Sequence, residues 1–399
     1  MGTDDISVPV DIRSGSGTGR PLTVLHIITG LGDGGAEAVL YRLVSADRDH
    51  DHEVISLMDA GKYGPMLQEL GVRVHTLGMP GGSLTSGGLR HLWRLVRATD
   101  ADVVQTWMYH ADLVGGGFAR MAGARAIVWG LHNTYLDQRK TRLMVRACAA
   151  ASRLVPRTII SCSDEAARMH VARGYSRRRM TVVPNGYDLG RFQHDAAARV
   201  RLRAELGIGP DALALGMVAR WDPQKDHANL ITALSRVGDG PGRPWRLILV
   251  GREMDASNTQ LTRLLDAAGL RDRVLLLGQR PDIPAVMSAL DLHVLSSVAE
   301  AFPNVVAEAM ACETLCLVTD TGDAALIVGD TGWVVPPRDS AQLAAGLRTA
   351  LIALGDTDAI QLRRRDARAR IEAHFSVERM VESYSRVWQA AADDRSTPS

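Results

Sequence analysis

Short apolar runs that alternate with helix-like segments constrain the fold of this chain more than any other feature. Continuous apolar runs are typical of strands buried on both faces of a parallel sheet, and helices between such strands form right-handed crossovers. The first series of runs comprises residues 23–29, 52–58, 72–78, 101–107, 125–132 and 157–163. After a turn within residues 180–188, a second series comprises residues 213–221, 246–252, 273–279, 290–296 and 314–320. The pattern predicts an α/β fold with two doubly wound, Rossmann-like domains and a cleft between them.

Length and turn signals predict the domain limits. The 399 residues favour two domains. We expect a first domain over residues 21–185 and a second over residues 186–375, since the Pro-Asn-Gly sequence at 184–186 favours a turn. Residues 1–20 contain acids and a Gly/Ser tract and are expected to be a disordered tail. The amphipathic segment 376–392 is expected to be a helix that packs back on the first domain.

Composition favours a cytoplasmic protein. No run of about 18 apolar residues occurs that could span a membrane, and residues 1–20 lack the apolar core of a signal peptide. The four cysteines, two of them Cys312 and Cys316, lack nearby partners for a zinc site and are expected to be reduced, buried thiols. Two Asp-x-Asp pairs, at Asp49 and at Asp356, lie in polar segments and are expected to be solvated, so no metal site is predicted.

The charge is balanced overall but locally basic. A formal net charge of +1 gives no reason to expect nucleic acid as a partner. Segment 139–155 predicts a helix without acids, with Arg139, Arg142, Arg146 and Arg153 on one face and Leu143 and Leu154 among the apolar residues of the other. This helix is either an ordinary surface helix or a contact with an anionic membrane at its inner face or with a lipid-diphosphate acceptor.

The segment 296–311 carries the strongest functional signal. It places Glu300 and Glu308 eight positions apart, in the loop after an apolar run and in a helix that is expected to start near Pro303. The first amides of a helix are unpaired and lie at its positive dipole end, so they attract an anion. Two carboxylates that bind hydroxyl groups, with amides between them that bind phosphate, predict a nucleotide-sugar site.

Two cations follow a strand of the second domain. Arg220 and Lys225 lie at a strand's carboxyl end, where open α/β sheets bind ligands, and together they suit a diphosphate. Alternatively, they form loop ion pairs with Asp222 or Asp226.

The first domain offers a glycine-rich turn and two histidines. Gly30, Gly32 and Gly35 match G-x-G-x-x-G, but the acid that a dinucleotide site expects after the second strand is absent. A structural tight turn is therefore favoured over a dinucleotide site. His110 follows one strand, and His132 with Asn133 ends the next, so these side chains could reach one cleft.

Taken together, these motifs resemble the retaining GT-B glycosyltransferases of family 4, and most of all the bacterial enzymes of capsule, exopolysaccharide and lipopolysaccharide assembly. The resemblance covers residues 21–392 and rests on R-x4-K at 220–225, LVGRE at 249–253, E-x7-E at 300–308 and GDAALIVGDTGWVVPPRD at 322–339. GLGDGGAE, TWMYHADLVGG and VVPNGYD support it in the first domain. It departs at Ala301, where many members have glycine, and at Ala38, where many have arginine.

The resemblance implies roles for individual residues. Glu308 would bind the ribose, Glu300 would contact the donor sugar, and Arg220 and Lys225 would neutralise the diphosphate. His110 would face the transferred sugar. The implied substrate-binding positions are Gly34, Gly35, His132, Asn133, Gly251, Ala301, Phe302, Pro303, Asn304 and Val305.

We therefore expect a metal-independent, retaining hexosyltransferase without a cofactor. A UDP-sugar is favoured over a GDP-sugar as donor, with a saccharide or polyprenyl-diphosphate-linked acceptor. Because no carboxylate is placed as a nucleophile, same-face attack is favoured, with Arg220 and Lys225 stabilising the leaving phosphate. The alternatives are a nucleotide-sugar epimerase, a phosphorylase, for which no pyridoxal-binding lysine is evident, and a catalytically silent subunit that binds nucleotide sugars.

Overall fold

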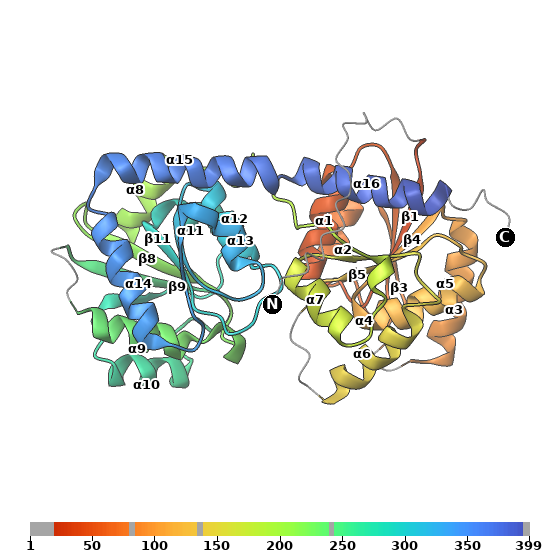
Figure 1. The fold of residues 1–399 in the computed structure, drawn as a ribbon, viewed down its shortest axis with the longest axis horizontal. Helices are drawn as coiled ribbons and strands as arrows, with labels where there is room; N and C mark the ends of the chain where they lie inside the picture. Colours follow the sequence, from red (N-terminus) through yellow and green to blue (C-terminus); the bar gives the residue numbers. More distant parts are fainter. Residues whose placement is uncertain (1–19, 80–83, 134–138, 239–242, 394–399) are drawn as a thin grey trace, which may run out of the picture. The chain divides into compact units, whose positions relative to one another are not determined.

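The chain folds into two α/β units. The computed structural model describes residues 20–79, 84–133, 139–238 and 243–393 (Figure 1). The first unit comprises the chain up to Gly186 together with the segment from Val377 onward, and the second comprises Tyr187–Ser376. Apart from residue 20, the expected tail lies outside the described residues.

Unit 1 is built on a seven-stranded parallel sheet of order β3-β2-β1-β4-β5-β6-β7. In chain order the strands are β1 (Thr23–Ile28), β2 (Asp51–Ser56), β3 (Arg73–Thr76), β4 (Val103–Trp107), β5 (Ile127–Leu131), β6 (Thr158–Ser161) and β7 (Met180–Val182). All the pairs are parallel, so the carboxyl ends of these strands meet at one edge. Strand order reverses between β1 and β4, and ligands bind beside such a reversal in open α/β sheets.

Helices cover both faces of this sheet. They are α1 (Gly35–Ala46), α2 (Tyr63–Glu69), α3 (Ser86–Thr99), α4 (Met108–His110), the π-helix η1 (Ala111–Gly115), α5 (Gly116–Met121), α6 (Arg139–Ala151), α7 (Asp164–Ala172), the 3-10 helix η2 (Arg177–Arg179) and α16 (Val377–Asp393). One core cluster joins α1, α2 and α16 to the sheet, and the other joins α3, α5, α6 and α7 to its opposite face. The last helix, although far away in sequence, therefore completes the core of unit 1.

Unit 2 has a six-stranded parallel sheet of order β10-β9-β8-β11-β12-β13. The strands are β8 (Leu213–Val218), β9 (Trp245–Val250), β10 (Val274–Leu276), β11 (Leu292–Leu295), β12 (Leu315–Thr319) and β13 (Trp333–Val335). Here too every pair is parallel. The reversal of strand order lies between β8 and β11.

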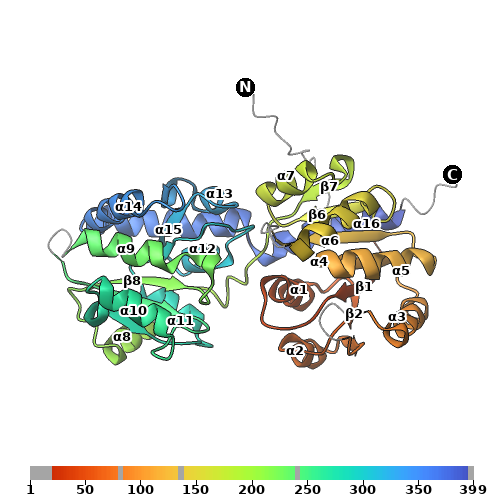
Figure 2. The same ribbon diagram turned by 90° about the horizontal axis from the view of Figure 1, so that it is seen from below.

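The helices of unit 2 alternate with its strands along the chain. They are α8 (Ala196–Glu205), η3 (Pro223–Lys225), α9 (His227–Val237), α10 (Thr259–Ala267), η4 (Arg271–Arg273), α11 (Ile283–Ala289), α12 (Asn304–Ala311), α13 (Ala324–Val328), η5 (Gly329–Thr331), α14 (Ser340–Ala353) and α15 (Thr357–His374). The helices α9 and α14 lie side by side (Figures 1 and 2). The predicted α/β class and the division into two parallel sheets are confirmed.

A buried carboxylate fixes the amino end of β11. Asp291 is 6% exposed and accepts hydrogen bonds from Arg199 (2.5 Å) and Arg203 (3.0 Å) of α8 and from the amide of Ala214 (2.8 Å). Burial alone would raise the pKa of Asp291, but the two guanidinium groups and this amide hold it below its usual value. The network ties α8 to β8 and β11, the two strands that carry the candidate site at their other ends.

The predicted faces of the basic helix are partly wrong. α6 ends at Ala151, so Arg153 and Leu154 lie beyond it. Leu143 is 72% exposed and lies outward near Arg142 and Arg146, whereas Val145 and Cys148 are buried. The buried face is therefore centred on Val145, Cys148 and Ala149 rather than on Leu143.

Candidate active site

The candidate site of unit 2 lies where the strand order reverses. The loop after β8 contains Arg220 and Lys225, and the loop after β11 contains Glu300. The two loops are joined by hydrogen bonds: the amide of Val298 donates to the carbonyl of Gln224 (2.8 Å), and the hydroxyl of Ser296 donates to the carbonyl of Lys225 (2.8 Å). These bonds position the cation-bearing loop against the carboxylate-bearing loop before any ligand binds.

Lys225 and Glu300 form an ion pair at this junction. Nζ of Lys225 lies 2.5 Å from Oε1 of Glu300, and the same oxygen accepts a hydrogen bond from Ser297 (2.6 Å). The two side chains are only 18% and 11% exposed, so the pair is partly shielded from water. An anion that binds Lys225 must therefore compete with Glu300, and a sugar hydroxyl near Glu300 meets an oriented carboxylate.

Arg220 also has an acidic partner in the ligand-free fold. Its guanidinium contacts Asp222, with Nε 3.1 Å and NH2 2.9 Å from Oδ2. Burial alone would raise the pKa of Asp222, but the amide of Gln224 and the Arg220 guanidinium keep it below its usual value. Arg220 is half exposed, so its guanidinium is accessible to a ligand. The loop ion pair that the sequence left open does form, and it does not bury the cation.

Two glycines allow the loops to approach one another closely. Gly251, after β9, has φ +146°, and a Cβ there would lie 2.2 Å from the carbonyl oxygen of Ala219. Gly322, after β12, has φ +56°, and a Cβ there would lie 2.5 Å from the carbonyl oxygens of Glu300 and Ala301. Glycine is needed at both positions. Gly322 was not predicted as a site residue, although its place after a strand was a usable signal.

The loop from Glu300 leads into α12. This helix begins at Asn304, and its N-cap residue, Pro303, makes no side-chain cap. The start of a helix carries partial positive charge, which attracts anions. Glu308 lies in the second turn and is half-buried. The side chain of Asn304 accepts a hydrogen bond from the buried hydroxyl of Tyr187 (2.6 Å), which fixes the start of the helix.

Some predicted binding residues are packed inside the protein. Phe302 is buried, with its ring stacked on Tyr187 at 6.5 Å and edge-on to Phe375 at 5.6 Å. Ala301 and Pro303 are buried too, whereas Val305 is half-buried. The predicted run 301–305 thus offers its backbone more than its side chains.

In unit 1, His110 follows an unusual stretch of backbone. Met108, directly after β4, has φ +70°, a region that non-glycine residues rarely adopt. The π-helix η1 starts one residue after His110, which is half-buried. Both features are over-represented at functional sites. The sequence predicted neither the positive φ of Met108 nor the π-helix η1, because the side chains in this segment do not require either backbone conformation.

His132 lies at the end of β5, and its environment differs from that of His110. Its ring stacks on Trp107, with centroids 5.1 Å apart and an interplanar angle of 20°. Both ring nitrogens are buried, and neither has a hydrogen-bond partner among the described residues. Burial and the charge of Arg42 lower the pKa of His132 to about 4, so the imidazole is neutral at pH 7. A buried polar group without a partner is costly.

The glycine-rich turn is closely packed. Gly34 is the N-cap of α1, and a Cβ there would overlap the carboxylate of Glu37 at 2.3 Å. Gly61 approaches the same turn, since a Cβ there would lie 2.3 Å from the carbonyl of Leu31. Gly35 starts the helix. Asn133, in turn, is half-buried, and its carbonyl accepts a hydrogen bond from Tyr109 at 3.4 Å.

Two further observations concern metals and membranes. The described residues contain no group of three or more His, Cys, Asp or Glu side chains that could hold a metal ion. No described helix is both long and apolar enough to cross a membrane.

Two family models match the chain. One, described as Glycosyltransferase Family 4, matches residues 33–191, and the other, described as Glycosyl transferases group 1, matches residues 212–352. The chain belongs to glycosyltransferase family 4. The resemblance inferred from the sequence motifs is confirmed.

Individual relatives agree with the family. The chain is 26% identical over 313 residues to the putative glycosyltransferase EpsF of Bacillus subtilis, covering 75% of this chain and 79% of EpsF. It is 24% identical over 303 residues to a UDP-Gal:α-D-GlcNAc-diphosphoundecaprenol α-1,3-galactosyltransferase of Escherichia coli. The match covers 73% of this chain and 76% of that enzyme. The structure resembles that of Anabaena HepE, which was solved in complex with UDP. The TM-score is 0.81 at 23% sequence identity, and the match covers 92% of this chain and 100% of HepE. This likeness shows the GT-B fold.

Proposed function

We propose that this glycosyltransferase moves a sugar from a nucleoside-diphosphate sugar, UDP-linked rather than GDP-linked, to a saccharide or polyprenyl-diphosphate-linked acceptor in the assembly of a bacterial surface polysaccharide. The observation that carries the proposal is the Lys225–Glu300 pair, held at the junction of two hydrogen-bonded loops beside the start of α12. The UDP complex of HepE and the substrates for which the Escherichia coli galactosyltransferase is named favour a UDP-sugar and a lipid-linked acceptor.

The proposal assigns the donor to unit 2. Glu308 binds the ribose hydroxyls, Arg220 and Lys225 bind the diphosphate, and Glu300 binds the donor sugar. The first amides of α12 add partial positive charge beside the phosphates. When the diphosphate binds, Arg220 and Lys225 exchange their carboxylate partners for phosphate oxygens, which gives charge-assisted hydrogen bonds of the same kind.

We propose transfer with retention and without a metal. The bond from the anomeric carbon to the phosphate oxygen breaks, and a bond to the acceptor oxygen forms on the same face of the sugar. The proton of the acceptor hydroxyl passes to the leaving phosphate oxygen, so no protein base is needed. Lys225 and Arg220 stabilise the negative charge that develops on the diphosphate.

In unit 1, we propose that His132 and His110 take part in substrate binding. The support is the neutral, buried imidazole of His132, whose two nitrogens have no partner among the described residues. A neutral imidazole can donate one hydrogen bond and accept another without adding a charge.

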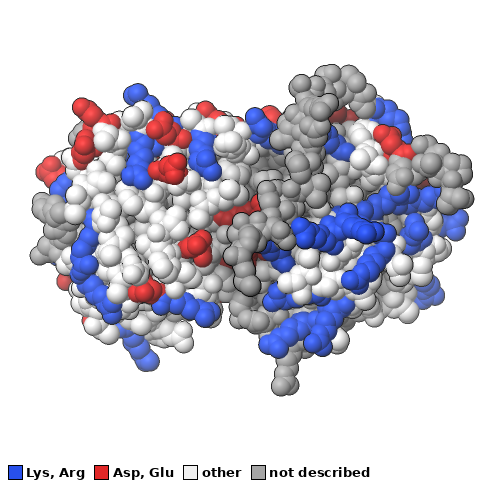
Figure 3. Space-filling model, viewed as in Figure 1, with Lys and Arg blue, Asp and Glu red and all other residues white. Residues whose placement is uncertain are grey.

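We also propose that α6 contacts an anionic membrane in which a lipid-linked acceptor is embedded. Basic side chains gather on the face of unit 1 that carries this helix (Figure 3). Arg142 and Arg146 line a pocket of about 270 Å³ with Arg173, and Leu143 is exposed between them. Exposed leucine flanked by arginine is typical of helices that lie at a membrane interface.

The first test is a thermal-shift and transfer screen of the purified protein against UDP-, GDP- and ADP-sugars, with and without EDTA. We expect stabilisation by the UDP class, unaffected by EDTA and reduced in Glu308→Ala and Lys225→Ala, because ligand that binds only the folded state raises Tm. Turnover should fall by orders of magnitude in Lys225→Ala. The control is Arg271→Ala, which removes an exposed arginine paired with Asp266. Arg271 lies just before β10, whereas the candidate site lies at the carboxyl ends of the strands of the same sheet.

Other outcomes would favour the alternatives. Stabilisation by NAD(H) but by no nucleotide sugar would favour the dinucleotide hypothesis. An altered free nucleotide sugar formed without acceptor would indicate an epimerase. Binding without hydrolysis or transfer would indicate a silent subunit.

A further inference from the structure

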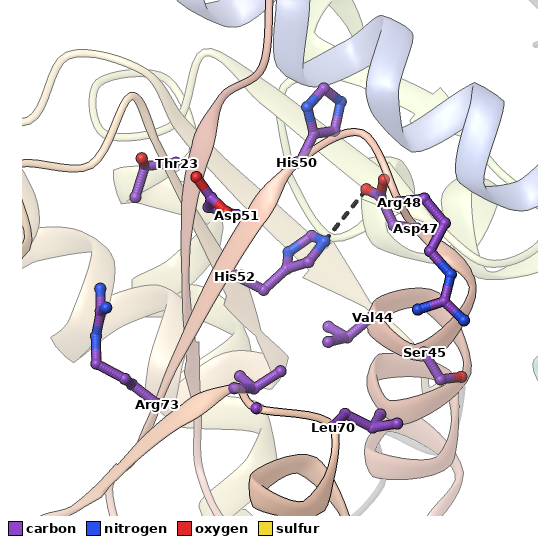
Figure 4. A pocket seen from close by; sticks show the side chains of 12 residues that line it. Thr23, Val44, Ser45, Asp47, Arg48, His50, Asp51, His52, Leu70 and Arg73 are labelled. Atoms are coloured by element: carbon purple, nitrogen blue, oxygen red, sulfur yellow. Dashed lines mark ion pairs between the residues drawn. The ribbon is translucent and has the colours of Figure 1, made fainter.

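A buried chain of polar side chains crosses the sheet of unit 1. Nε1 of Trp107 lies 3.2 Å from Nδ1 of His26, and Nε2 of His26 lies 3.0 Å from Nδ1 of His52. Nε2 of His52 in turn lies 3.2 Å from Oδ2 of Asp47. Figure 4 shows the last pair, drawn with a dashed line, at a pocket of about 370 Å³ near the amino ends of β1 and β2.

The chemistry of these groups determines where each proton lies. An indole N–H can only donate, so Nδ1 of His26 must accept and its proton must be on Nε2. Nε2 of His26 therefore donates to Nδ1 of His52, which leaves the proton of His52 on Nε2, toward Asp47. Both hydrogen bonds run in one direction, from Trp107 through His26 to His52, and the N–H of His52 faces Asp47. The other oxygen of Asp47 accepts from the amide of Asp49 at 2.9 Å, which fixes that end.

These polar side chains lie in the core of unit 1 and are covered by the last helix, α16. His26 and Trp107 are fully buried. Trp388 of α16 packs edge-on against His26 and His52, with centroids 5.8 Å away in both cases, and donates a hydrogen bond to the side chain of Gln105 (3.1 Å). Apolar side chains of similar size would fill this space without the cost of desolvating three polar groups. The directional hydrogen bonds of Trp107 and His26, unlike apolar contacts, specify one orientation of each ring.

Trp107 connects this chain to the candidate site. One face of its indole stacks on His132 at 20°, and its N–H is held by His26. Since stacking is the contact that orients the His132 ring while both ring nitrogens lack a partner among the described residues, the plane of His132 depends on the plane of Trp107. Tyr384 of α16 also stacks on Trp107, with centroids 6.0 Å apart and planes at 15°.

We propose that Asp47, His52 and His26 are positioning residues, which fix the ring of Trp107 and through it the orientation of the His132 ring toward its ligand. The inference rests on the proposed function, because that function assigns His132 to substrate binding. It predicts that breaking the chain lowers turnover without weakening nucleotide binding by unit 2.

A matched pair of substitutions at His26 tests the proposal. His26→Leu keeps the volume and removes both hydrogen bonds, whereas the amide of His26→Gln can accept from Trp107 and donate to His52. We expect kcat to fall about 10- to 100-fold in His26→Leu, as for a small misplacement of a reacting group, with an unchanged Kd for UDP. His26→Gln should recover most of the loss. Equal kcat in the wild-type protein and His26→Leu would overturn the proposal, and so would equal losses in the two variants.

A second measurement needs no substitution and covers the case in which His26→Leu does not fold. In the wild-type protein labelled with 15N-histidine, NMR at pH 7 should show His26 neutral, with its proton on Nε2. A proton on Nδ1 of His26 would overturn the chain. If the wild-type protein binds no nucleotide and transfers no sugar, the proposed function fails instead, whatever the tautomers are.

Discussion

At the scale of single residues, the two cationic side chains of the candidate site form ion pairs with carboxylates. Lys225 and Arg220 both face carboxylates in the ligand-free fold. Glu300 therefore has two opposing effects in our proposal, since it competes with the diphosphate for Lys225 and binds the donor sugar. The two effects can be separated, because UDP has a diphosphate but no sugar to be transferred.

This separation gives a prediction for Glu300→Gln. The substitution keeps the size of the side chain but removes the charge that competes for Lys225. We expect UDP to bind about 3- to 10-fold more tightly, as the loss of a partly shielded pair worth on the order of 1 kcal/mol implies, and sugar transfer to fall. Titration calorimetry with UDP and a transfer assay measure the two effects. Asp266→Asn, at the pair with Arg271, should change neither, and weaker UDP binding in Glu300→Gln would contradict the competition.

At the scale of elements, α6 combines structure and surface chemistry. Its inner face packs Val145 and Cys148 in the core, and its outer face presents Arg142, Leu143 and Arg146. Burial raises the pKa of the Cys148 thiol to about 12, so this cysteine is unreactive in the folded protein. The exposed Leu143 and Arg146 can therefore be substituted without removing the side chains that fill the core.

The membrane proposal for α6 predicts the effect of substitutions on its outer face. Leu143→Asp and Arg146→Glu should reduce co-sedimentation with vesicles that contain phosphatidylglycerol, since each basic residue near such a surface contributes about 1 kcal/mol. Leu362→Asp on α15, where the leucine is 61% exposed, is the control. Vesicles of phosphatidylcholine alone should bind the wild-type protein weakly. Equal binding of all the variants to the anionic vesicles would rule out α6 as the contact.

The sequence predicted the positions of helices and strands better than it predicted which helix face is buried or which side chains form ion pairs. Apolar runs located the strands because most positions of a strand covered on both faces are buried, and Pro303 marked the start of α12. The orientation of α6 could not be predicted, because Leu143 and Val145 are both apolar and only the shape of the core distinguishes them. The Lys225–Glu300 pair joins loops 75 positions apart, and the sequence suggested the two partners without their contact. The positive φ of Met108 has no signature in its side chain.

At the scale of the whole molecule, buried neutral histidines link stability to pH. In unit 2, burial lowers the pKa of His227 to about 4 and that of His293 to about 3. In the unfolded chain both have an ordinary pKa of about 6.5. Below that pH the unfolded state binds more protons than the folded state, so the free energy of unfolding falls as pH falls. In unit 1, His132 and His170 act in the same direction, whereas burial raises the pKa of Asp112 and opposes them.

Unit 2 therefore gives the clearer pH prediction. Between about pH 6 and pH 4.5 its free energy of unfolding should fall by up to about 3 kcal/mol per pH unit, from two protons at about 1.4 kcal/mol each. Hydrogen exchange of peptides from β11, followed by mass spectrometry across this range, measures it. His293→Gln should roughly halve the slope, and the exposed His194→Gln should leave it unchanged. A flat profile in the wild-type protein would show that these histidines are protonated in the fold.

The returning helix α16 has a consequence for the order in which the protein is made. A chain leaves the ribosome from its amino end, and domains generally fold as they emerge. Unit 1, however, obtains Trp388 and Tyr384 only after all of unit 2 has been synthesised. Until then His26, His52 and Trp107 lack their cover and face solvent or a chaperone. Translation must therefore finish unit 2 before unit 1 can complete its core, so the half of the enzyme that begins first is completed last.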